Sequence, residues 1–432
     1  MIETNMQLTE DEIELLSGKH GKTMQKIMET LTRFGDVCGA KRFVPLDGPS
    51  HMVGTYATNA TKPYGEMLDK LAAEGIRTKF PFTGNPVPYD AQLMCTEEEE
   101  QVFEKLFAEQ KRMEANLEKI GMISSDAYTC TCYLPQVNNI PKRGGNYAWA
   151  ESSAVVFSNS VFGARTNRNG GPIDLFCAIV GKAPQFGLLT DEGRKADWVV
   201  EVKTSALPHP HLLGSAIGLK VIEQVPYIKG LTEHLGTQLD LKTQDYLKDM
   251  GASTASNGAV GLYHIEFLTP EACEFGTALI RPDAKIYVID DEELERVKSS
   301  YPLMWKNPEN APGLAFIGCP HNSYNQLSDW TMRLEAELTK QNKSKLAVAT
   351  IFLAATPVLN EFQKSALYPK LSKMGASLSH MCPLLYMLNP HFANKNIITN
   401  SNKLRTYTTA KYVDDIKLAQ ILVEGGICNE KV

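Results

Sequence analysis

The sequence lacks an excess of positive charge. Its 432 residues include 44 Lys and Arg against 50 Asp and Glu, which gives a formal net charge of −6. A protein that binds the phosphate backbone of a nucleic acid needs a basic surface that neutralises many phosphates. The composition therefore argues against nucleic acid as a partner.

Long hydrophobic runs are missing as well. The first residues, Met1 to Asn5, have neither the positive charge nor the apolar core of a secretory signal. The longest apolar run, from Leu346 to Ala355 with one threonine, is about half as long as a membrane-spanning helix. We therefore expect a cytoplasmic protein that does not cross a membrane.

Cysteine pairs of the CxxC type are also absent. The nine cysteines are an odd number and are scattered along the chain, so they do not form the disulfide framework of a small secreted protein. A zinc-finger type of site is not indicated either. In a reducing compartment each cysteine is a small buried apolar residue, the commoner case, or a ligand or nucleophile.

What the chain does contain is an alternation of strand-like and helix-like segments, which predicts an α/β fold. Helix-like stretches lie at 291–299 and 328–339. β-branched or aromatic runs typical of strands occur in five places: 198–202, 262–267, 285–290, 313–318 and 346–355. A single hydrophobic core seldom grows this large, so we expect two or three packed lobes at approximately 1–125, 126–300 and 301–432.

Two amphipathic helical stretches are predicted in the first 125 residues. The first begins with a capping box, in which Glu12 returns a hydrogen bond to the amide of Thr9, and continues toward Leu31. The second runs from Thr96 to Ile120, where apolar residues recur at helical spacing, and ends at Gly121. Both patterns indicate surface helices whose charged faces meet solvent.

Three cysteines stand where an apolar or polar stretch gives way to a turn or a proline. Cys130 lies in Tyr-Thr-Cys-Thr-Cys-Tyr-Leu-Pro, Cys319 in Phe-Ile-Gly-Cys-Pro-His and Cys382 in Ser-His-Met-Cys-Pro. Ligands collect at strand ends in α/β folds, and thiolates on separate loops can converge on one iron–sulfur cluster. The spacing alone leaves open the alternative of three buried structural cysteines.

The segment from Trp149 to Pro172 combines an apolar run with many polar residues and a glycine pair. Arg165 offers a planar fork to a carboxylate, and the amides near Gly170 and Gly171 allow a close approach to an anion. The functional interpretation is an anion pocket. The structural alternative is an ordinary helix or strand end with capping side chains.

Several short motifs occur in order from Leu8-Thr-Glu-Asp-Glu and Gly18-Lys-His-Gly onward: Glu151-Ser-Ser-Ala-Val-Val-Phe, Asn159-Ser, Gly163-Ala-Arg-Thr-Asn-Arg with Gly170-Gly-Pro, Ser256-Asn-Gly-Ala-Val leading to His264 and Thr269-Pro-Glu-Ala, Gly318-Cys-Pro-His and Thr399-Asn-Ser-Asn-Lys. Together they resemble the successive signature blocks of the aconitase X family. The motifs span most of the chain, and this makes the resemblance more specific than any one of them.

The resemblance implies an aconitase-like, multi-lobed α/β fold around an iron–sulfur cluster, whose nuclearity it does not fix. Three cysteines hold the cluster and leave one position for substrate and water. By analogy the ligands are Cys130, Cys319 and Cys382. The first block has a second thiol, Cys132, where a proline is expected, so Cys130 and Cys132 are alternatives, and the third block departs from an expected Asp-Thr-Cys ending.

The resemblance also implies roles around the cluster. The reaction removes a weakly acidic proton beside a carboxylate and expels hydroxide, and a Lewis-acidic iron assists both. Catalytic roles are assigned to Arg165, His321 and Lys403, with Arg165 neutralising the carboxylate as charge develops. Substrate-binding roles are assigned to a larger polar set: His51, Glu151, Ser152, Asn159, Thr166, Asn167, Gly170, Gly171 and Ser401.

In this family a small swivelling domain completes the site and supplies the serine that acts as base. The chain ends at Val432, soon after the block that contains Lys403, so we expect that domain as a separate small subunit. The expected activity is an iron–sulfur hydro-lyase acting on a small hydroxylated acid. Cis-3-hydroxy-L-proline is the preferred substrate, and phosphomevalonate is the alternative.

Two other classes of function remain as alternatives. A non-catalytic iron–sulfur sensor or scaffold would keep the aconitase-like shell, and the altered residues at Cys132 and before Cys382 motivate it. A thiol enzyme would use one reactive cysteine, with His321 or His380 as base, and would hold no iron. Iron content separates the second of these from the cluster proteins.

Overall fold

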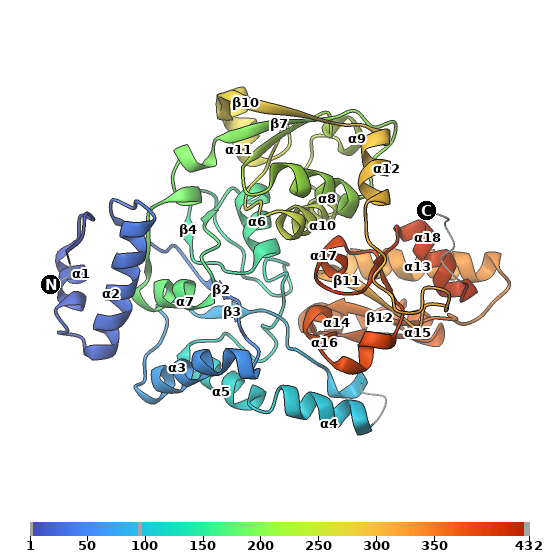
Figure 1. Ribbon diagram of the computed structural model, residues 1–432, viewed down its shortest axis with the longest axis horizontal. Helices are drawn as coiled ribbons and strands as arrows, with labels where there is room; N and C mark the ends of the chain where they lie inside the picture. The colour runs from blue at the N-terminus through green and yellow to red at the C-terminus, as the bar shows by residue number, and fades with distance from the viewer. Residues whose placement is uncertain (1–2, 94–96, 427–432) are drawn as a thin grey trace.

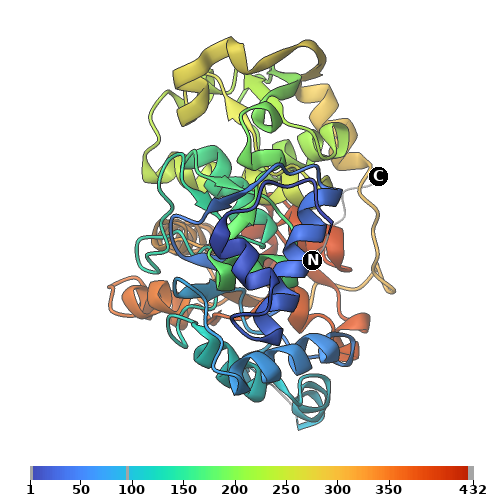
Figure 2. The same cartoon turned by 90° about the vertical axis from the view of Figure 1, so that its left-hand side faces the viewer.

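The computed structural model describes residues 3–93 and 97–426, which form three regions around a shared centre (Figure 1). The N-terminal region lies at the left and bottom of that view, the middle region at the top and the C-terminal region at the right. Figure 2 looks onto the side formed by the first two helices. The predicted α/β class is confirmed, and the proposed lobe boundaries at 125 and 300 stay a prediction.

The N-terminal region pairs its strands two by two, with β1 antiparallel to β6, β2 parallel to β3 and β4 parallel to β5. One hydrophobic core draws on its helices and strands. The elements are α1 (Glu10–Leu16), α2 (Lys22–Val37), β1 (Phe43–Pro45), β2 (Ser50–Met52), α3 (Lys62–Ala73), β3 (Phe82–Gly84), α4 (Glu97–Leu106), α5 (Gln110–Ile120), β4 (Asn146–Tyr147), α6 (Ser152–Val161), β5 (Arg165–Thr166), α7 (Gly171–Val180) and β6 (Lys182–Pro184).

Both predicted helical stretches are present, but each is divided in two. The capping box at Thr9 is confirmed, and α1 ends at Leu16 because Gly18 and Gly21 adopt positive φ angles of 84° and 94°. The second stretch divides into α4 and α5. Phe103 in α4 packs into a core shared with the C-terminal region, whereas Leu117 in α5 packs into the N-terminal core, so the two halves face different partners.

The middle region is built on a parallel four-stranded sheet in the order β10-β7-β8-β9. Helices α8 and α10 pack against each other, and α10 also packs against α6 and α17 from the two other regions. The elements are β7 (Ala196–Val202), α8 (Pro210–Val221), β8 (Pro226–Lys229), α9 (Thr232–Leu235), α10 (Leu241–Asn257), β9 (His264–Ile265), α11 (Pro270–Phe275), β10 (Ile280–Ile289) and α12 (Asp291–Ser299).

The C-terminal region has a parallel five-stranded sheet in the order β13-β12-β11-β14-β15. Its central strand β11 is buried at every residue, as expected of a strand covered on both faces. The elements are β11 (Leu314–Asn322), α13 (Tyr324–Lys340), β12 (Ala349–Ala354), α14 (Thr356–Phe362), α15 (Tyr368–Lys373), β13 (Ala376–Ser379), α16 (Pro383–Tyr386), β14 (Ile397–Thr399), α17 (Asn402–Tyr407), β15 (Lys411–Tyr412) and α18 (Asp415–Glu424).

Each of the five predicted strand runs contains a strand, although the run at 262–267 yields only the two residues of β9. Helix α12 has the predicted bounds. The described helices, those of residues 3–93 and 97–426, are all too short or too polar to span a lipid bilayer.

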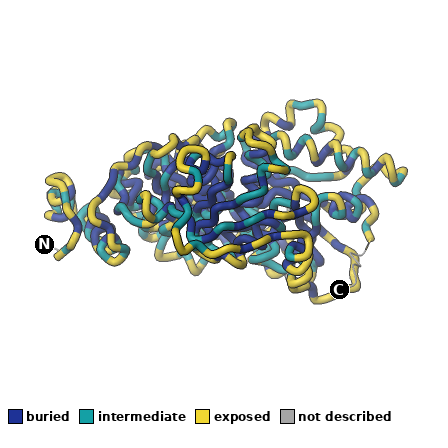
Figure 3. The backbone as a smooth tube through the Cα atoms, turned by 90° about the horizontal axis from the view of Figure 1, so that it is seen from above, coloured by how far each residue is buried: buried dark blue, intermediate teal, exposed yellow. Residues whose placement is uncertain are grey.

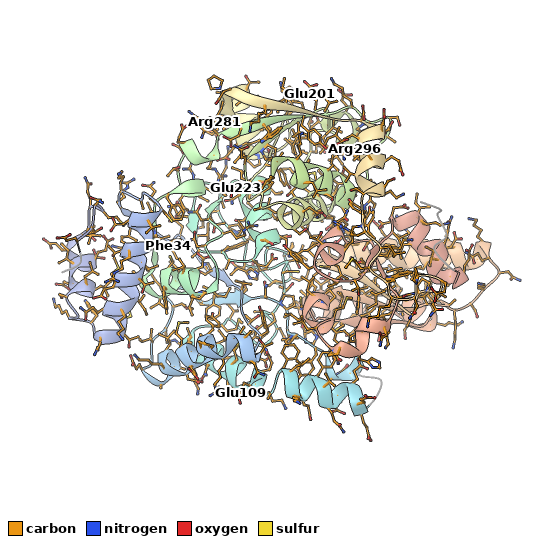
Figure 4. All side chains as sticks on the ribbon, in the orientation of Figure 1. Phe34, Glu109, Glu201, Glu223, Arg281 and Arg296 are labelled. Atoms are coloured by element: carbon orange, nitrogen blue, oxygen red, sulfur yellow. The ribbon has the colours of Figure 1, made fainter. Side chains whose placement is uncertain are left out.

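Packed side chains hold each region together and also join the regions to one another. Within the N-terminal region, Phe34 of α2, labelled in Figure 4, meets Phe186 edge to face with ring centroids 5.6 Å apart. Leu134 and Val137 pack against the cores of both the middle and the C-terminal regions. Figure 3 shows buried backbone running through the interior and exposed backbone at the periphery. The junction of the regions is therefore a buried environment in which a site can form.

Candidate functional site

Three separate segments bring Cys130, Cys319 and Cys382 to the junction of the regions. Cys130 lies in the loop between α5 and β4, Cys319 lies near the end of strand β11, and Cys382 follows β13 and begins α16. The backbone amide of His321 donates to Sγ of Cys130 over 3.3 Å, so the first two segments are in direct contact. Cys130 and Cys319 are buried, and Cys382 is partly buried.

The three thiols are buried or partly buried groups whose charges influence one another. Burial raises the pKa of Cys130 and of Cys319 to about 12 and that of Cys382 to about 11. Charge repulsion adds to this, because Cys319 raises the pKa of Cys130, Cys382 that of Cys319, and Cys130 that of Cys382. Lys403 lowers the pKa of all three. The thiols therefore share one neighbourhood with a cation beside them.

This donor set fits an iron–sulfur cluster better than a single metal ion. Soft thiolate ligands are those that iron–sulfur clusters take. Within the described part of the chain, no three His, Cys, Asp or Glu side chains are close enough to hold one metal ion. A cluster needs wider spacing, because cysteines on separate loops bind different iron atoms of it.

The alternative thiol in the first loop, Cys132, has a different environment. Its side chain is fully buried, and burial raises its pKa well above the usual range. Cys130 instead accepts a hydrogen bond at Sγ from the amide of His321, two residues after Cys319, over 3.3 Å. This contact favours Cys130 over Cys132 as the partner of the other two thiols.

A buried ion pair lies beside the thiols. Lys403 in α17 bonds to Glu151 at the start of α6, and their side chains are 8% and 4% exposed. Glu151 also accepts from Ser153 Oγ at 2.6 Å and from the Ala154 amide at 2.7 Å. Burial alone would raise the pKa of Glu151, but Lys403 and these hydrogen bonds lower it to about 2. Burial alone would lower the pKa of Lys403, but Glu151 and the thiols raise it.

His51 in β2 lies next to this pair. Burial lowers its pKa to about 4, and its Nδ1 is 2.8 Å from Oγ1 of Thr83. Thr83 Oγ1 also accepts from Asn139 Nδ2 at 2.9 Å. Asn85 lies beside the ring and raises its pKa, but no hydrogen bond of ordinary geometry joins the described residues to Nε2. His51 is therefore neutral at pH 7 with one ring nitrogen still available.

Three more buried polar atoms near the thiols have no hydrogen-bond partner among the described residues. They are Oδ1 of Asn85, Oδ1 of Asn139 and Oη of Tyr133. The side chain of Asn139 donates to Oγ1 of Thr83. The pKa of Tyr133 is raised chiefly by burial and further by the thiol of Cys130. Buried polar atoms are nearly always paired in folded proteins, so this group indicates a place for a ligand or water.

His321, two residues after Cys319, has both ring nitrogens engaged. Nδ1 is 3.0 Å from Oγ1 of Thr129, and Nε2 is 3.2 Å from the backbone oxygen of Met381. Burial lowers the pKa of the ring to about 3, so it is neutral. The catalytic role assigned to His321 stays a prediction. The hydrogen bonds connect it to the loops of Cys130 and Cys382.

The polar segment after α6 forms a second cluster around Arg194, which sequence reasoning did not single out. Arg194 donates to both carboxylate oxygens of Glu271 at 2.8 Å, to both oxygens of Asn159 at 3.1–3.2 Å and to the Leu188 carbonyl at 3.1 Å. All five of its N–H groups are thus used. We call this cluster the Arg194 network and define it by five residues: Asn159, Thr166, Asn167, Arg194 and Glu271.

Three predicted substrate-binding residues belong to the Arg194 network, and their side chains hydrogen-bond to backbone groups of the chain itself. Asn159 exchanges two hydrogen bonds of 2.9 Å with the backbone of Thr166. Thr166 Oγ1 accepts from the Trp149 amide at 3.0 Å. Asn167 donates to the Phe186 carbonyl at 2.9 Å and accepts from the Leu188 amide at 2.8 Å. These contacts hold the segment in place, and the substrate-binding roles stay predictions.

Of the remaining predicted residues, some lie beside the thiols and others lie in the polar segment after α6. Ser401 donates to the carbonyl of Cys319 and caps α17, and Ser152 lies beside Glu151. Arg165 forms an ion pair with Asp191 and is 24% exposed. Gly170 precedes α7 with φ of 98°, and a Cβ atom on Gly171 would lie 2.9 Å from the carbonyl oxygen of Val53.

Sequence reasoning missed several residues that line the thiols. Thr129 and Thr131 flank Cys130, and their alternation with the cysteines was the available signal. Lys248 of α10 is 2% exposed and donates from Nζ to the His321 carbonyl at 3.0 Å. It stands in an ordinary helical stretch, and nothing in the sequence near it indicated this contact.

Three family models match consecutive parts of the chain. Aconitase X first domain matches residues 5–192, aconitase X second domain matches residues 196–299, and aconitase X third domain matches residues 312–422.

Curated proteins are similar over nearly the whole chain. The phosphomevalonate dehydratase large subunit of Thermococcus kodakarensis is 31% identical over 424 residues, which cover 95% of this chain and 98% of that protein. The large subunit from Methanocaldococcus jannaschii is 30% identical and covers 93% and 95%. The cis-3-hydroxy-L-proline dehydratase of Pseudomonas aeruginosa is 28% identical, and the match covers 91% of this chain but 65% of that protein.

A solved structure is similar as well. The crystal structure of Thermococcus kodakaraensis aconitase X in its holo-form matches with a TM-score of 0.80 and 29% sequence identity. The match covers 96% of this chain and 99% of that one. The arrangement of the three regions is therefore that of a known aconitase X protein.

Proposed function

This chain belongs to the aconitase X family, and from that premise we propose that it is the large subunit of a phosphomevalonate dehydratase. It is a hydro-lyase. The observation that carries the choice of substrate is the match along 98% of the Thermococcus kodakarensis large subunit at 31% identity. The preference for cis-3-hydroxy-L-proline drawn from the sequence is less well supported than its alternative.

A small partner subunit is part of the proposal. The phosphomevalonate relatives are named as large subunits, and the hydroxyproline relative extends well beyond the 65% of its length that this chain matches. We propose that the partner is the swivelling domain and that it supplies a serine as base. We also propose a cytoplasmic location for the complex, which the free thiols of the described cysteines support.

In this proposal Cys130, Cys319 and Cys382 hold an iron–sulfur cluster. Their convergence at the junction of the regions and the thiolate chemistry of the set support the assignment. When bound, the cluster supplies a Lewis-acidic iron for the substrate's carboxylate and departing hydroxyl. Ser401 bonds to the carbonyl of Cys319 and keeps the second ligand loop in place.

The chain's own side chains prepare the site for an anionic substrate. Lys403 is a buried cation beside the thiols, and Glu151 keeps its ammonium charged and fixed in direction. In the reaction a proton leaves the carbon next to the carboxylate and the hydroxyl on the neighbouring carbon departs as water. Lys403 stabilises the negative charge that develops in between. Nε2 of neutral His51 makes no hydrogen bond of ordinary geometry with the described residues, although the side chain of Asn85 lies beside the ring, and we propose that it bonds a substrate oxygen.

The other assigned roles enter the proposal as predictions of lower rank. Arg165 is paired with Asp191, so binding the substrate's carboxylate would require it to exchange that partner. The roles of Gly170 and Gly171 stay predictions. Asn159 and Asn167 are occupied by backbone groups. The second candidate function, dehydration of cis-3-hydroxy-L-proline, is favoured by relatives that are 28% and 27% identical.

The test is an anaerobic assay of the cluster-loaded chain together with its small partner. Phosphomevalonate and cis-3-hydroxy-L-proline are offered separately, and mass spectrometry detects a product lighter by one water. We expect turnover of phosphomevalonate and none in the Cys319→Ala variant. Turnover of the hydroxyproline alone would replace the main proposal by the second candidate. A loaded complex that dehydrates neither compound would contradict both.

A further inference from the structure

We propose that His321 is a positioning residue that connects the three cysteine-bearing segments, so that the thiols are held in place before any cluster is bound. The inference rests on the proposed function, in which these thiols are the cluster ligands. It gives His321 a task other than proton transfer to the substrate. The carrying observation is that hydrogen bonds from this one residue reach the loops of both other cysteines.

The four polar groups of His321 are all engaged. Its amide donates to Sγ of Cys130 at 3.3 Å, and its Nδ1 lies 3.0 Å from Oγ1 of Thr129, the residue before Cys130. Its Nε2 lies 3.2 Å from the carbonyl oxygen of Met381, the residue before Cys382. Its own carbonyl accepts from Lys248 Nζ at 3.0 Å. The partners of the amide, Nδ1 and Nε2 are therefore Cys130 itself or a residue directly before a cysteine.

The directions of these hydrogen bonds follow from the groups involved. A backbone carbonyl only accepts, so the contact with Met381 requires the proton to sit on Nε2 of His321. Nδ1 then accepts, and the hydroxyl of Thr129 donates to it. Oγ1 of Thr129 in turn accepts from the amide of Thr131 at 3.1 Å and is 3.1 Å from its hydroxyl. One tautomer satisfies the whole chain of groups.

This arrangement leaves His321 little freedom for chemistry. Taking a proton on Nδ1 would reverse the direction of its hydrogen bond with Thr129, and losing one from Nε2 would break the link to Met381. His51 is different, because its Nε2 has no partner within the described residues. Of these two histidines, His51 is therefore the better placed to meet the substrate, and His321 holds the ligand segments.

A residue of the middle region, Lys248, holds the backbone of His321 in place. Lys248 is 2% exposed, and its ammonium also pairs with Asp249 Oδ1 at 3.0 Å. Helix α10, which contains both residues, packs against β11 and α17 of the C-terminal region. Groups that orient metal ligands in this way typically change metal affinity 10- to 100-fold when they are removed. We expect an effect of that size here.

The experiment compares Thr129→Val and His321→Gln with the wild-type chain, with Thr129→Ser as the conservative variant. Thr331→Val is the matched control, since Thr331 is equally buried and hydrogen-bonded but lies in α13. In the metal-free full chain, the alkylation rate of Cys130 by iodoacetamide is followed by mass spectrometry. After loading with iron and sulfide, the rate of iron release to a chelator and the electron paramagnetic resonance spectrum are recorded.

We expect Cys130 to react at least tenfold faster in Thr129→Val and His321→Gln than in wild type, Thr129→Ser or Thr331→Val. Iron release should accelerate 10- to 100-fold in the same two variants, with an altered spectrum. Unchanged alkylation in both variants would overturn the inference, whether or not iron is bound. A wild-type chain that takes up no iron would contradict the proposed function, while the alkylation rates still decide the role of His321.

Discussion

Two buried ion pairs of this protein invite comparison, since they have the same chemistry and different surroundings. Lys403–Glu151 lies beside the thiols with side chains 8% and 4% exposed, and Arg194–Glu271 lies in the Arg194 network with side chains 1% and 10% exposed. Around Arg194 every donor has an acceptor in the fold. Around Lys403, polar atoms of buried neighbours such as His51 remain without partners among the described residues.

The difference teaches how a binding site is told from a structural network. Both places are dense in polar residues, and buried charges in both are paired, as burial requires. A structural network satisfies itself, whereas a binding site keeps polar atoms for a ligand and tolerates their cost in its absence. By this criterion we expect the thiols, Lys403 and His51 to form the site and the Arg194 network to hold the neighbouring segment in place.

The largest expected effect comes from removing the cation at the thiols. Lys403→Met takes away the charge that stabilises the reacting anion, so kcat/KM should fall at least 1000-fold, or about 4 kcal/mol of transition-state stabilisation. Arg194→Met is the matched control, and the folded control should keep its kcat/KM within tenfold. Steady-state dehydration with the small partner measures both. Equal losses in the two variants would break the comparison.

At the Arg194 network we expect a substitution to lower the free energy of unfolding rather than the activity. Arg194→Met leaves Glu271 buried without a partner, and this typically costs about 3–5 kcal/mol of unfolding free energy. Adding Glu271→Leu removes the orphaned charge, so the double variant should recover most of the loss. Urea unfolding followed by circular dichroism measures each variant. A double variant no more stable than the single one would show that the pair is not a self-contained unit.

The thiol site should also make the metal-free chain sensitive to acid. In the folded chain burial disfavours the charged ring of His51 and lowers its pKa to about 4, from the ordinary value of 6.5. As the pH falls below 6.5 the unfolded chain takes up the proton first, so the stabilisation is complete above pH 6.5 and is lost as the pH approaches 4. The loss amounts to about 3 kcal/mol for this residue.

The matching variant is His51→Gln, which cannot take up the proton. Its unfolding free energy should change by about 3 kcal/mol less than that of wild type between pH 6.5 and 4. Urea unfolding at a series of pH values provides the comparison. Identical pH profiles for the two chains would mean that the ring of His51 is protonated in the folded state as readily as in the unfolded one.

The smallest expected effect concerns Asn167. Asn167→Ala leaves the Phe186 carbonyl and the Leu188 amide without their partner, and this should cost about 1–3 kcal/mol of unfolding free energy. Because the side chain is committed to the fold, kcat/KM of the folded variant should stay within threefold of wild type. A fall of 100-fold or more with little change in stability would instead support the substrate-binding role predicted from the sequence.

Much of the fold could be predicted because it depends on local patterns. Neighbouring residues alone determine three of its features: the capping box at Thr9, the apolar run of β11 and the bounds of α12. The division between α4 and α5 could not be predicted, since the helical periodicity continues across it. That division is decided by two separate cores, one at Phe103 and one at Leu117.

The site could be predicted only in part, for a similar reason. The turn-like settings of Cys130, Cys319 and Cys382 and the order of the family motifs singled out the three thiols. Which polar residues would satisfy one another was not visible, because the partners are far apart in sequence. Arg194 lies 35 residues from Asn159 and 77 from Glu271, and no local pattern joins such positions.

The central claim is that three thiols of this chain hold an iron–sulfur cluster, and its most direct test is metal analysis. Iron and sulfide are measured in the anaerobically reconstituted wild-type chain and in Cys130→Ala, Cys319→Ala and Cys382→Ala. Cys177→Ala, a fully buried cysteine of α7, is the control. We expect iron and sulfide in the wild type and the control and their loss in the other three. A reconstituted wild-type chain without metal, or three variants that keep it, would contradict the account.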